Sequence, residues 1–202
     1  MRISHSHKLI YLAVPRTGST TARNILDVSA DITSIHISTI TPDFPFYHHI
    51  SALELKKIFA ARGWNWDGYR KFCVIRNPYD RVVSLYHHRV ENLAKNAHQS
   101  PPSFKQYVFQ LNPTQRLPTS LQAFVCDESG DFLVQDILQF EQLHTQLPAY
   151  LHQIGISLSA DQIPRLNASR NRRSYRDYYD AETKARIGQL YRYEIERFGY
   201  VF

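Results

Sequence analysis

A short apolar run at residues 8–14 (KLIYLAV) leads directly into a polar turn at residues 15–21 (PRTGSTT). The run has the length of one buried strand, and residues 19–28 have the spacing of an amphipathic helix. In open α/β sheets, ligands gather where strands end and helices begin. The sequence therefore predicts a strand, a ligand-binding turn and a helix in succession.

Strand-like and helix-like segments alternate along the rest of the chain. Further strands are expected at about 33–37, 71–76 and 132–140, with helices at about 52–61, from Pro78 onward, up to about 153 and after Asp180. This alternation is typical of an α/β fold in which helices flank a parallel central sheet. The strand order cannot be read from the pattern. The 202 residues fit a single domain, 1–202.

The charge balance favours an anionic partner. Lysine and arginine total 24 against 18 acidic residues, which gives a formal charge of +6. Nucleic acid, acidic lipid and a phosphorylated or sulfated small molecule would all suit this charge. No basic tract of the kind that tracks a nucleic-acid backbone is present, because the densest cluster, 170–176 (RNRRSYR), is short and local, so no nucleic acid is expected. Charge alone does not choose among the remaining partners.

No apolar run approaches the roughly 20 residues of a membrane span, and no signal-peptide pattern opens the chain. The two cysteines, Cys73 and Cys126, lack the spacing of a disulfide framework or a zinc site. These features predict a soluble protein of the reducing cytoplasm, with no metal site.

The turn at 15–21 has the composition of a phosphate or sulfate cradle. Gly18 allows a ligand to approach the backbone, Arg16 adds a forked cation, and four hydroxyl side chains add donors at a helix N-terminus. An ordinary capped strand-to-helix turn is the alternative. The nucleotide-kinase pattern G-x-x-x-x-G-K-[ST] is absent.

A second anion-binding pair follows the strand at 71–76. Arg76 ends that strand and Ser84 lies two turns into the next helix, where together they could grip a phosphate. A surface arginine and a neutral helical serine are the alternative. A magnesium–nucleotide enzyme usually places a carboxylate at such a strand end, whereas this one ends in arginine.

Together the two segments resemble PAPS-dependent sulfotransferases, in which PAPS is 3′-phosphoadenosine 5′-phosphosulfate. PRTGSTT is similar to the family's 5′-phosphosulfate loop, P-K-T-G-[GT]-[TS], and FCVIRNPYDRVVSLYHH to its 3′-phosphate motif. The segments DILQFEQL, 166-LNAS-169 and the C-terminal region extend the likeness to the carbohydrate and heparan 2-O-sulfotransferase branch, including small bacterial relatives. The resemblance implies a P-loop-NTPase-like sulfotransferase fold that binds PAPS and releases PAP, the 3′,5′-bisphosphate.

The resemblance also assigns residues to the nucleotide. The 5′-phosphosulfate would be held by Arg16, Thr17, Gly18, Ser19, Thr20 and Thr21, and the 3′-phosphate by Arg76 and Ser84. A basic loop that closes over the adenine and 3′-phosphate would use Arg170, Arg172, Arg173 and Tyr175. Arg16 stands where the family usually has a catalytic lysine; arginine keeps the charge without the compact point donor, so slower turnover or an unusual substrate is expected.

Sulfuryl transfer to a hydroxyl group requires a proton acceptor. His48 and His49 precede Ser51, the expected cap of the helix at 52–61, and the positive end of a helix favours neutral imidazole. The segment YHHIS is similar to the histidine-x-serine element of the 2-O-sulfotransferase branch, which assigns the base to His49 and an assisting role to His48. His87 and His88 are expected to be solvated on the polar side of a helix.

These inferences predict in-line transfer from PAPS to a hydroxyl acceptor, without a required metal. A carbohydrate or glycoconjugate acceptor is implied by the resemblance alone. A proline-rich stretch at 100–120 is a candidate acceptor-side lid. The alternatives are a magnesium-dependent phosphotransferase with an atypical phosphate loop and a noncatalytic PAP-binding module.

Overall fold

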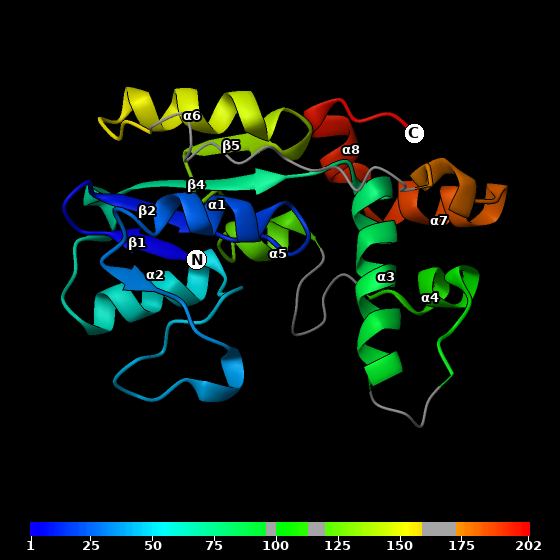
Figure 1. The fold of residues 1–202 in the computed structure, drawn as a ribbon, viewed down its shortest axis with the longest axis horizontal. Helices are drawn as coiled ribbons and strands as arrows, with labels where there is room; N and C mark the ends of the chain where they lie inside the picture. The colour runs from blue at the N-terminus through cyan, green and yellow to red at the C-terminus, as the bar shows by residue number, and fades with distance from the viewer. Residues whose placement is uncertain (96–99, 113–119, 159–172) are drawn as a thin grey trace.

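The computed structural model describes residues 1–95, 100–112, 120–158 and 173–202. At its centre is a five-stranded sheet in the order β3-β1-β2-β4-β5 (Figure 1). The strands are β1 (Arg2–Ser4), β2 (Leu9–Leu12), β3 (Ile32–Thr33), β4 (Arg70–Ile75) and β5 (Asp136–Gln139).

The sheet is mixed, with a parallel half that carries the predicted strand-to-helix turns. β2 pairs in parallel with β4, and β4 pairs in parallel with β5. β1 runs antiparallel to both β2 and β3 and was not predicted. The predicted α/β class is confirmed, and the antiparallel β1 is an addition to it.

Two predicted strands are shorter than expected. β3 stops at Thr33, and Ile35 forms only an isolated bridge with Tyr47. β5 begins at Asp136 because Phe132, inside the predicted strand, pairs instead with Cys126 in another isolated bridge. An apolar run predicts burial at both places, but it does not show which backbone it will pair with.

The helices are α1 (Ser19–Leu26), α2 (Ala52–Ala61), α3 (Pro78–Lys95), α4 (Phe104–Gln110), α5 (Leu121–Val125), α6 (Leu143–Gln153), α7 (Ala181–Leu190) and α8 (Arg192–Phe198). α2 begins at the predicted capping box, in which the Ser51 hydroxyl accepts from the Glu54 backbone N–H. One helix was predicted after Asp180, but the chain forms two, with Tyr191 at the break. Among the described residues, no helix combines the length and apolarity of a membrane span.

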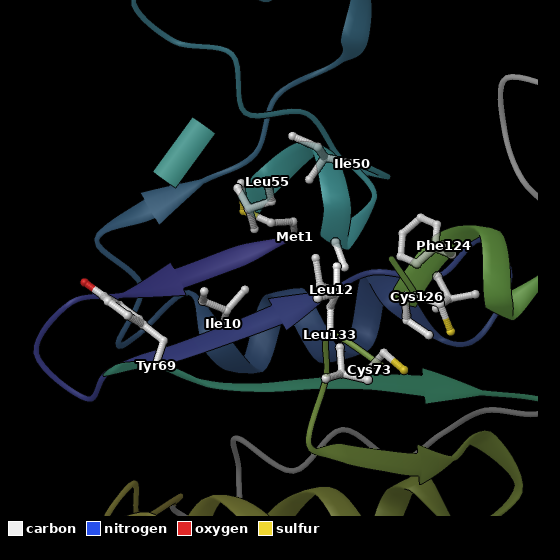
Figure 2. Packing of buried hydrophobic residues seen from close by; sticks show 14 of the residues in the cluster. Met1, Ile10, Leu12, Ile50, Leu55, Tyr69, Cys73, Phe124, Cys126 and Leu133 are labelled. Atoms are coloured by element: carbon white, nitrogen blue, oxygen red, sulfur yellow. The ribbon is translucent and has the colours of Figure 1, made fainter. Parts of the chain in front are cut away.

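Side chains of β2 alternate between two cores, as a strand buried on both faces requires. Leu9 and Tyr11 pack in the cluster that contains α1 and α6, whereas Ile10 and Leu12 pack in the cluster that contains α2 and α5. Figure 2 shows Ile10 and Leu12 in this second cluster, together with Cys73 of β4. Helices therefore cover both faces of the parallel half of the sheet.

A third core cluster is formed by buried residues of α3, α4 and α7 together with Tyr191. α3 runs from the end of β4 with α4 and α7 beside it (Figure 1). A buried ion pair reinforces this arrangement, with Arg81 Nη2 of α3 lying 3.1 Å from Glu194 Oε2 of α8. α3 is thus anchored at its base, so the side chains on its first turns have fixed positions relative to the strand ends.

Candidate active site

A cavity of about 500 Å³ opens where the turns after β2 and β4 meet. Its lining comes from four parts of the chain, namely the 15–21 turn with α1, the loop before α2, the segment from Arg76 along α3, and the residue after β5. The lining residues are Pro15, Arg16, Gly18, Ser19, Thr20, Arg23, His49, Arg76, Ser84, Leu85, His88 and Phe140. The two predicted anion-binding segments therefore lie side by side at the strand ends and line one cavity.

The helix that follows the turn has an uncapped N-terminus. Gly18 is the N-cap residue of α1, in the left-handed region at φ 75°, and as a glycine it has no side chain with which to cap the first-turn N–H groups. Those N–H groups, at the positive end of the helix, are available to an anion. Gly18 is also crowded, because an added Cβ would lie 3.0 Å from the Phe140 ring. The turn thus depends on glycine for both its conformation and its packing.

The predicted 5′-phosphosulfate residues divide into two groups. Arg16, Gly18, Ser19 and Thr20 line the cavity, whereas Thr17 and Thr21 lie outside the lining set. Thr17 is fully buried and donates its hydroxyl to the Val14 carbonyl at 2.9 Å. In this structure, Thr17 shapes the turn from within.

Arg76 joins the strand end to the turn. Its buried guanidinium donates from Nη1 to the Arg16 carbonyl at 3.1 Å, and from Nη2 to Asp80 Oδ2 at 2.6 Å. It also lies 4.3 Å from the centroid of the Phe140 ring. Asp80, in the first turn of α3, thus orients the arginine of the second anion-binding pair.

Arg16 and Ser84 bring the two predicted pockets into direct contact. Arg16 Nε donates to Ser84 Oγ at 3.0 Å. Arg16 is exposed at the cavity and has a positive φ of 63°, a conformation uncommon for a residue with a side chain. Three arginines, Arg16, Arg23 and Arg76, line the cavity, and none of its described lining residues is a carboxylate. The cavity therefore suits a polyanionic ligand.

His49 is held as a neutral imidazole. Its Nδ1 lies 2.7 Å from the Ala13 carbonyl, which can only accept, so Nδ1 carries the proton and Nε2 remains an acceptor. Burial lowers the pKa of His49 to about 4, and the charges of Arg23 and Arg16 act in the same direction. Near neutral pH the side chain is thus an uncharged hydrogen-bond acceptor at the cavity wall.

His48 lies outside the cavity lining, although it adjoins His49 in sequence. Its Nδ1 lies 2.9 Å from Ser34 Oγ, and its carbonyl accepts from the Met1 ammonium at 2.8 Å. Burial, followed by the charge of Arg23, lowers the pKa of His48 to about 4. The structure therefore separates the two histidines, giving His49 the place at the cavity and His48 a place in the loop's hydrogen-bonded support.

The sequence analysis missed two polar residues of the cavity lining, Arg23 and His88. Arg23 lies one turn after Ser19 on α1, and its Nε donates to the Ser19 carbonyl at 3.2 Å. His88 lies one turn after Ser84 on α3; it is exposed, as predicted, but the surface on which it lies is the wall of the cavity. In both cases the i, i+4 spacing from a predicted site residue was the signal that could have found them. His87, by contrast, bonds through Nε2 to the Tyr178 hydroxyl at 3.0 Å.

The predicted basic loop is only partly described. Arg173 pairs with Asp177 at 3.4 Å and Tyr175 packs edge-on against Phe202, and both lie outside the cavity lining. Arg170, Arg172 and the 166–169 segment lie outside the described residues. Of the stretch proposed as a lid, 113–119 is also outside them, and α4 packs with α3 and α7 in the third core.

An uncapped helix N-terminus, clustered arginines and a neutral histidine beside the ends of parallel strands are features of an α/β protein that binds a polyanionic ligand such as a nucleotide. The sulfotransferase family model matches residues 1–201, and the chain belongs to that family. The predicted family, PAPS-dependent sulfotransferases, and the predicted enzyme class are confirmed.

The fold is also similar to that of a solved sulfotransferase. Mouse sulfotransferase SULT7A1, crystallised as a complex with PAP, superposes with a TM-score of 0.56 over 95% of this chain and 86% of that chain. The sequences are 12% identical, so this likeness concerns the fold alone. Among curated proteins, none matches the sequence significantly.

Proposed function

We propose that this enzyme transfers a sulfuryl group from PAPS to a hydroxyl group of a carbohydrate, with His49 as the general base. The observation that carries the proposal is the joining of two cationic pockets and one neutral imidazole in a single cavity. The PAP complex of the mouse enzyme, which shares the fold, supports the choice of nucleotide.

In this proposal the two pockets hold opposite ends of the donor. Arg16, Ser19, Thr20 and the first-turn N–H groups of α1 bind the 5′-phosphosulfate, while Arg76 and Ser84 bind the 3′-phosphate. The hydrogen bond between Arg16 and Ser84 gives way, because each of these groups then bonds to a phosphate oxygen. The Arg76–Asp80 pair keeps the guanidinium aligned with the strand end.

The transfer step then needs one proton acceptor and stabilisation of one leaving group. The acceptor hydroxyl gives its proton to His49 Nε2, and its oxygen forms a bond to sulfur. The bond between sulfur and the 5′-phosphate oxygen breaks, and PAP leaves with that electron pair. Arg16 and the N–H groups at the start of α1 stabilise the charge on this oxygen. The hydrogen bond to the Ala13 carbonyl keeps the base in the required tautomer.

Labelled PAPS and a panel of hydroxyl acceptors test the function. Wild type should transfer label, and His49→Ala should reduce kcat by about 100-fold or more while PAP affinity stays within about threefold. His48→Ala is the matched control, since it removes the neighbouring imidazole outside the cavity. Equal turnover by wild type and His49→Ala would remove the base assignment and leave the fold and family unaffected.

Calorimetry separates the proposal from its two competitors. Binding of PAP without magnesium supports the sulfotransferase function, whereas affinity for ATP only with magnesium would support a phosphotransferase. A protein that binds PAP tightly and transfers no label to any acceptor would be a noncatalytic module. The carbohydrate acceptor rests on the resemblance of the sequence to one branch of the family and is decided by the same acceptor panel.

A further inference from the structure

His88 is a polar residue of the cavity wall to which the proposed donor site gives no role. It follows Ser84 by one turn on α3, and both side chains line the cavity. Because α3 leads away from the end of β4, His88 lies about 6 Å farther from the sheet along the helix axis. It therefore lies beyond the proposed 3′-phosphate pocket, toward the open side of the cavity, where its side chain is exposed.

One ring nitrogen of His88 is already engaged. Nε2 lies 3.2 Å from Asn92 Nδ2, one further turn along α3, which fixes the orientation of the ring. Among the described residues, no hydrogen-bond partner is present for Nδ1. Partial burial and the nearby Arg16 lower the pKa of His88, with Lys95 adding to this effect and Glu91 opposing it. The ring is thus an uncharged group with one hydrogen-bonding position left for a bound molecule.

His49 and His88 have complementary arrangements. His49 is fixed through Nδ1 by the Ala13 carbonyl and offers Nε2, whereas His88 is fixed through Nε2 by Asn92 and offers Nδ1. The proposed function uses His49 on the reacting hydroxyl and uses Arg16, Arg76 and Ser84 on the donor. A second oriented imidazole in the same cavity therefore matches a second polar group on the acceptor.

We propose that His88 determines acceptor specificity by hydrogen-bonding a second hydroxyl group of the acceptor through Nδ1. The inference rests on the proposed function and deepens it. It names a polyhydroxylated acceptor, in which another hydroxyl lies near the reacting one, in place of a simple alcohol or phenol. A site that provides a hydrogen bond to one substrate hydroxyl discriminates against analogues that lack it.

Two probes that differ in this second hydroxyl test the inference. 4-Nitrophenyl β-D-galactopyranoside offers neighbouring hydroxyls, and 4-nitrobenzyl alcohol offers only one. Steady-state rates with labelled PAPS are measured for wild type, His88→Ala, His88→Gln and His87→Ala. His87→Ala is the matched control, because His87 bonds to Tyr178 outside the cavity lining.

Wild type should prefer the galactoside. His88→Ala should raise the KM for the galactoside by about tenfold, as loss of one hydrogen bond predicts. Its kcat/KM for the simple alcohol should stay within twofold of wild type. His88→Gln should restore part of the loss, because its amide can hydrogen-bond in the same direction. His87→Ala should match wild type on both probes, and PAP affinity should be unchanged in all three variants.

Several results would overturn the inference. These are equal losses on the two probes, no loss on the galactoside, preference of wild type for the simple alcohol, or weakened PAP binding in His88→Ala. Wild type that binds PAP and sulfates the alcohol but not the galactoside would remove this inference and leave sulfuryl transfer standing. Wild type that neither binds PAP nor consumes PAPS would remove the proposed function itself, and the inference with it.

Discussion

Arg16 and Ser84 are 68 positions apart in sequence, yet a 3.0 Å hydrogen bond joins the Arg16 guanidinium to the Ser84 hydroxyl. Each residue belongs to a different predicted anion-binding segment. The bond shows that the two segments form a single site. It also shows where the arginine in the family's lysine position directs its side chain.

Replacement of Arg16 should separate the need for charge from the need for a guanidinium. Arg16→Met should reduce turnover of PAPS by about 100-fold, since a charged donor to the leaving oxygen is lost. Arg16→Lys keeps the charge and should retain turnover within about tenfold of wild type. Steady-state kinetics with labelled PAPS measure both. Equal activity of Arg16→Met and wild type would exclude Arg16 from leaving-group stabilisation.

Nucleotide binding should make His49 a stronger base. Burial and nearby cations hold its pKa at about 4 in this structure. The phosphates of PAP would offset the positive charge of Arg16 and Arg23, so the pKa should rise toward the ordinary histidine value of about 6.5. NMR titration of the imidazole carbons, with His49→Gln to assign the signal, measures the pKa with and without PAP. An unchanged or lower value would contradict this electrostatic account.

Stability should decrease as the pH falls from about 6.5 to about 4. His48 and His49 both have a folded-state pKa of about 4, so in this window the unfolded chain binds more protons than the folded one. Their contribution is complete above about pH 6.5 and is lost as the pH falls toward 4. Urea denaturation across this range measures it. A His48→Gln, His49→Gln double variant should show a shallower pH dependence than wild type.

Gly18→Ala should weaken both the fold and nucleotide binding. The substitution adds strain at φ 75° and places a Cβ 3.0 Å from the Phe140 ring, so a loss of about 2 kcal/mol in unfolding free energy is expected. Gly63→Ala is the matched control, because Gly63 has a similar φ of 65° and open space around its Cβ position. Thermal denaturation and PAP calorimetry compare the two variants. If they behaved alike, the contact with Phe140 would have no part in the effect.

Removal of one partner of the Arg81–Glu194 pair should destabilise the fold strongly. Both side chains are buried, and Glu194 Oε1 also accepts from the Leu121 N–H at 2.6 Å. Glu194→Ala leaves the buried guanidinium without this partner and should lower the unfolding free energy by about 3 kcal/mol. Lys105→Ala, which breaks an exposed ion pair with Glu182, should change it by less than about 1 kcal/mol. Chemical denaturation of both variants provides the comparison.

The sequence was sufficient where a local pattern decides the structure. The strand, turn and helix from β2 to α1 follow from a change of hydrophobic period, and the start of α2 follows from Ser51 and Glu54. β1 was missed because its three residues are too few to show a period and its pairing with β2 is a tertiary choice. The break at Tyr191 likewise has neither glycine nor proline at the junction itself, and Gly188 lies within α7.

Local sequence patterns also fail to place some single side chains of the cavity. A polar residue on an amphipathic helix satisfies the pattern equally well when it faces bulk solvent or a site, and for that reason the place of the exposed His88 in the cavity wall was missed. Asp80 lies in the first turn of the helix that was expected to begin at Pro78, but its bond to Arg76 depends on the path of the chain after β4. Contacts of this kind become visible only when the elements are assembled.

The bond from Arg76 to the Arg16 carbonyl couples the two proposed phosphate-binding pockets. The guanidinium proposed to hold the 3′-phosphate also supports the peptide unit that cradles the 5′ side. A change in the contacts of Arg76 with the 3′-phosphate would therefore also change the support that Arg76 gives to the turn around Arg16. An adenosine 5′-phosphosulfate without its 3′-phosphate would lose one set of contacts and, in addition, meet a less ordered turn, so the enzyme should reject it more strongly than the missing contacts alone require.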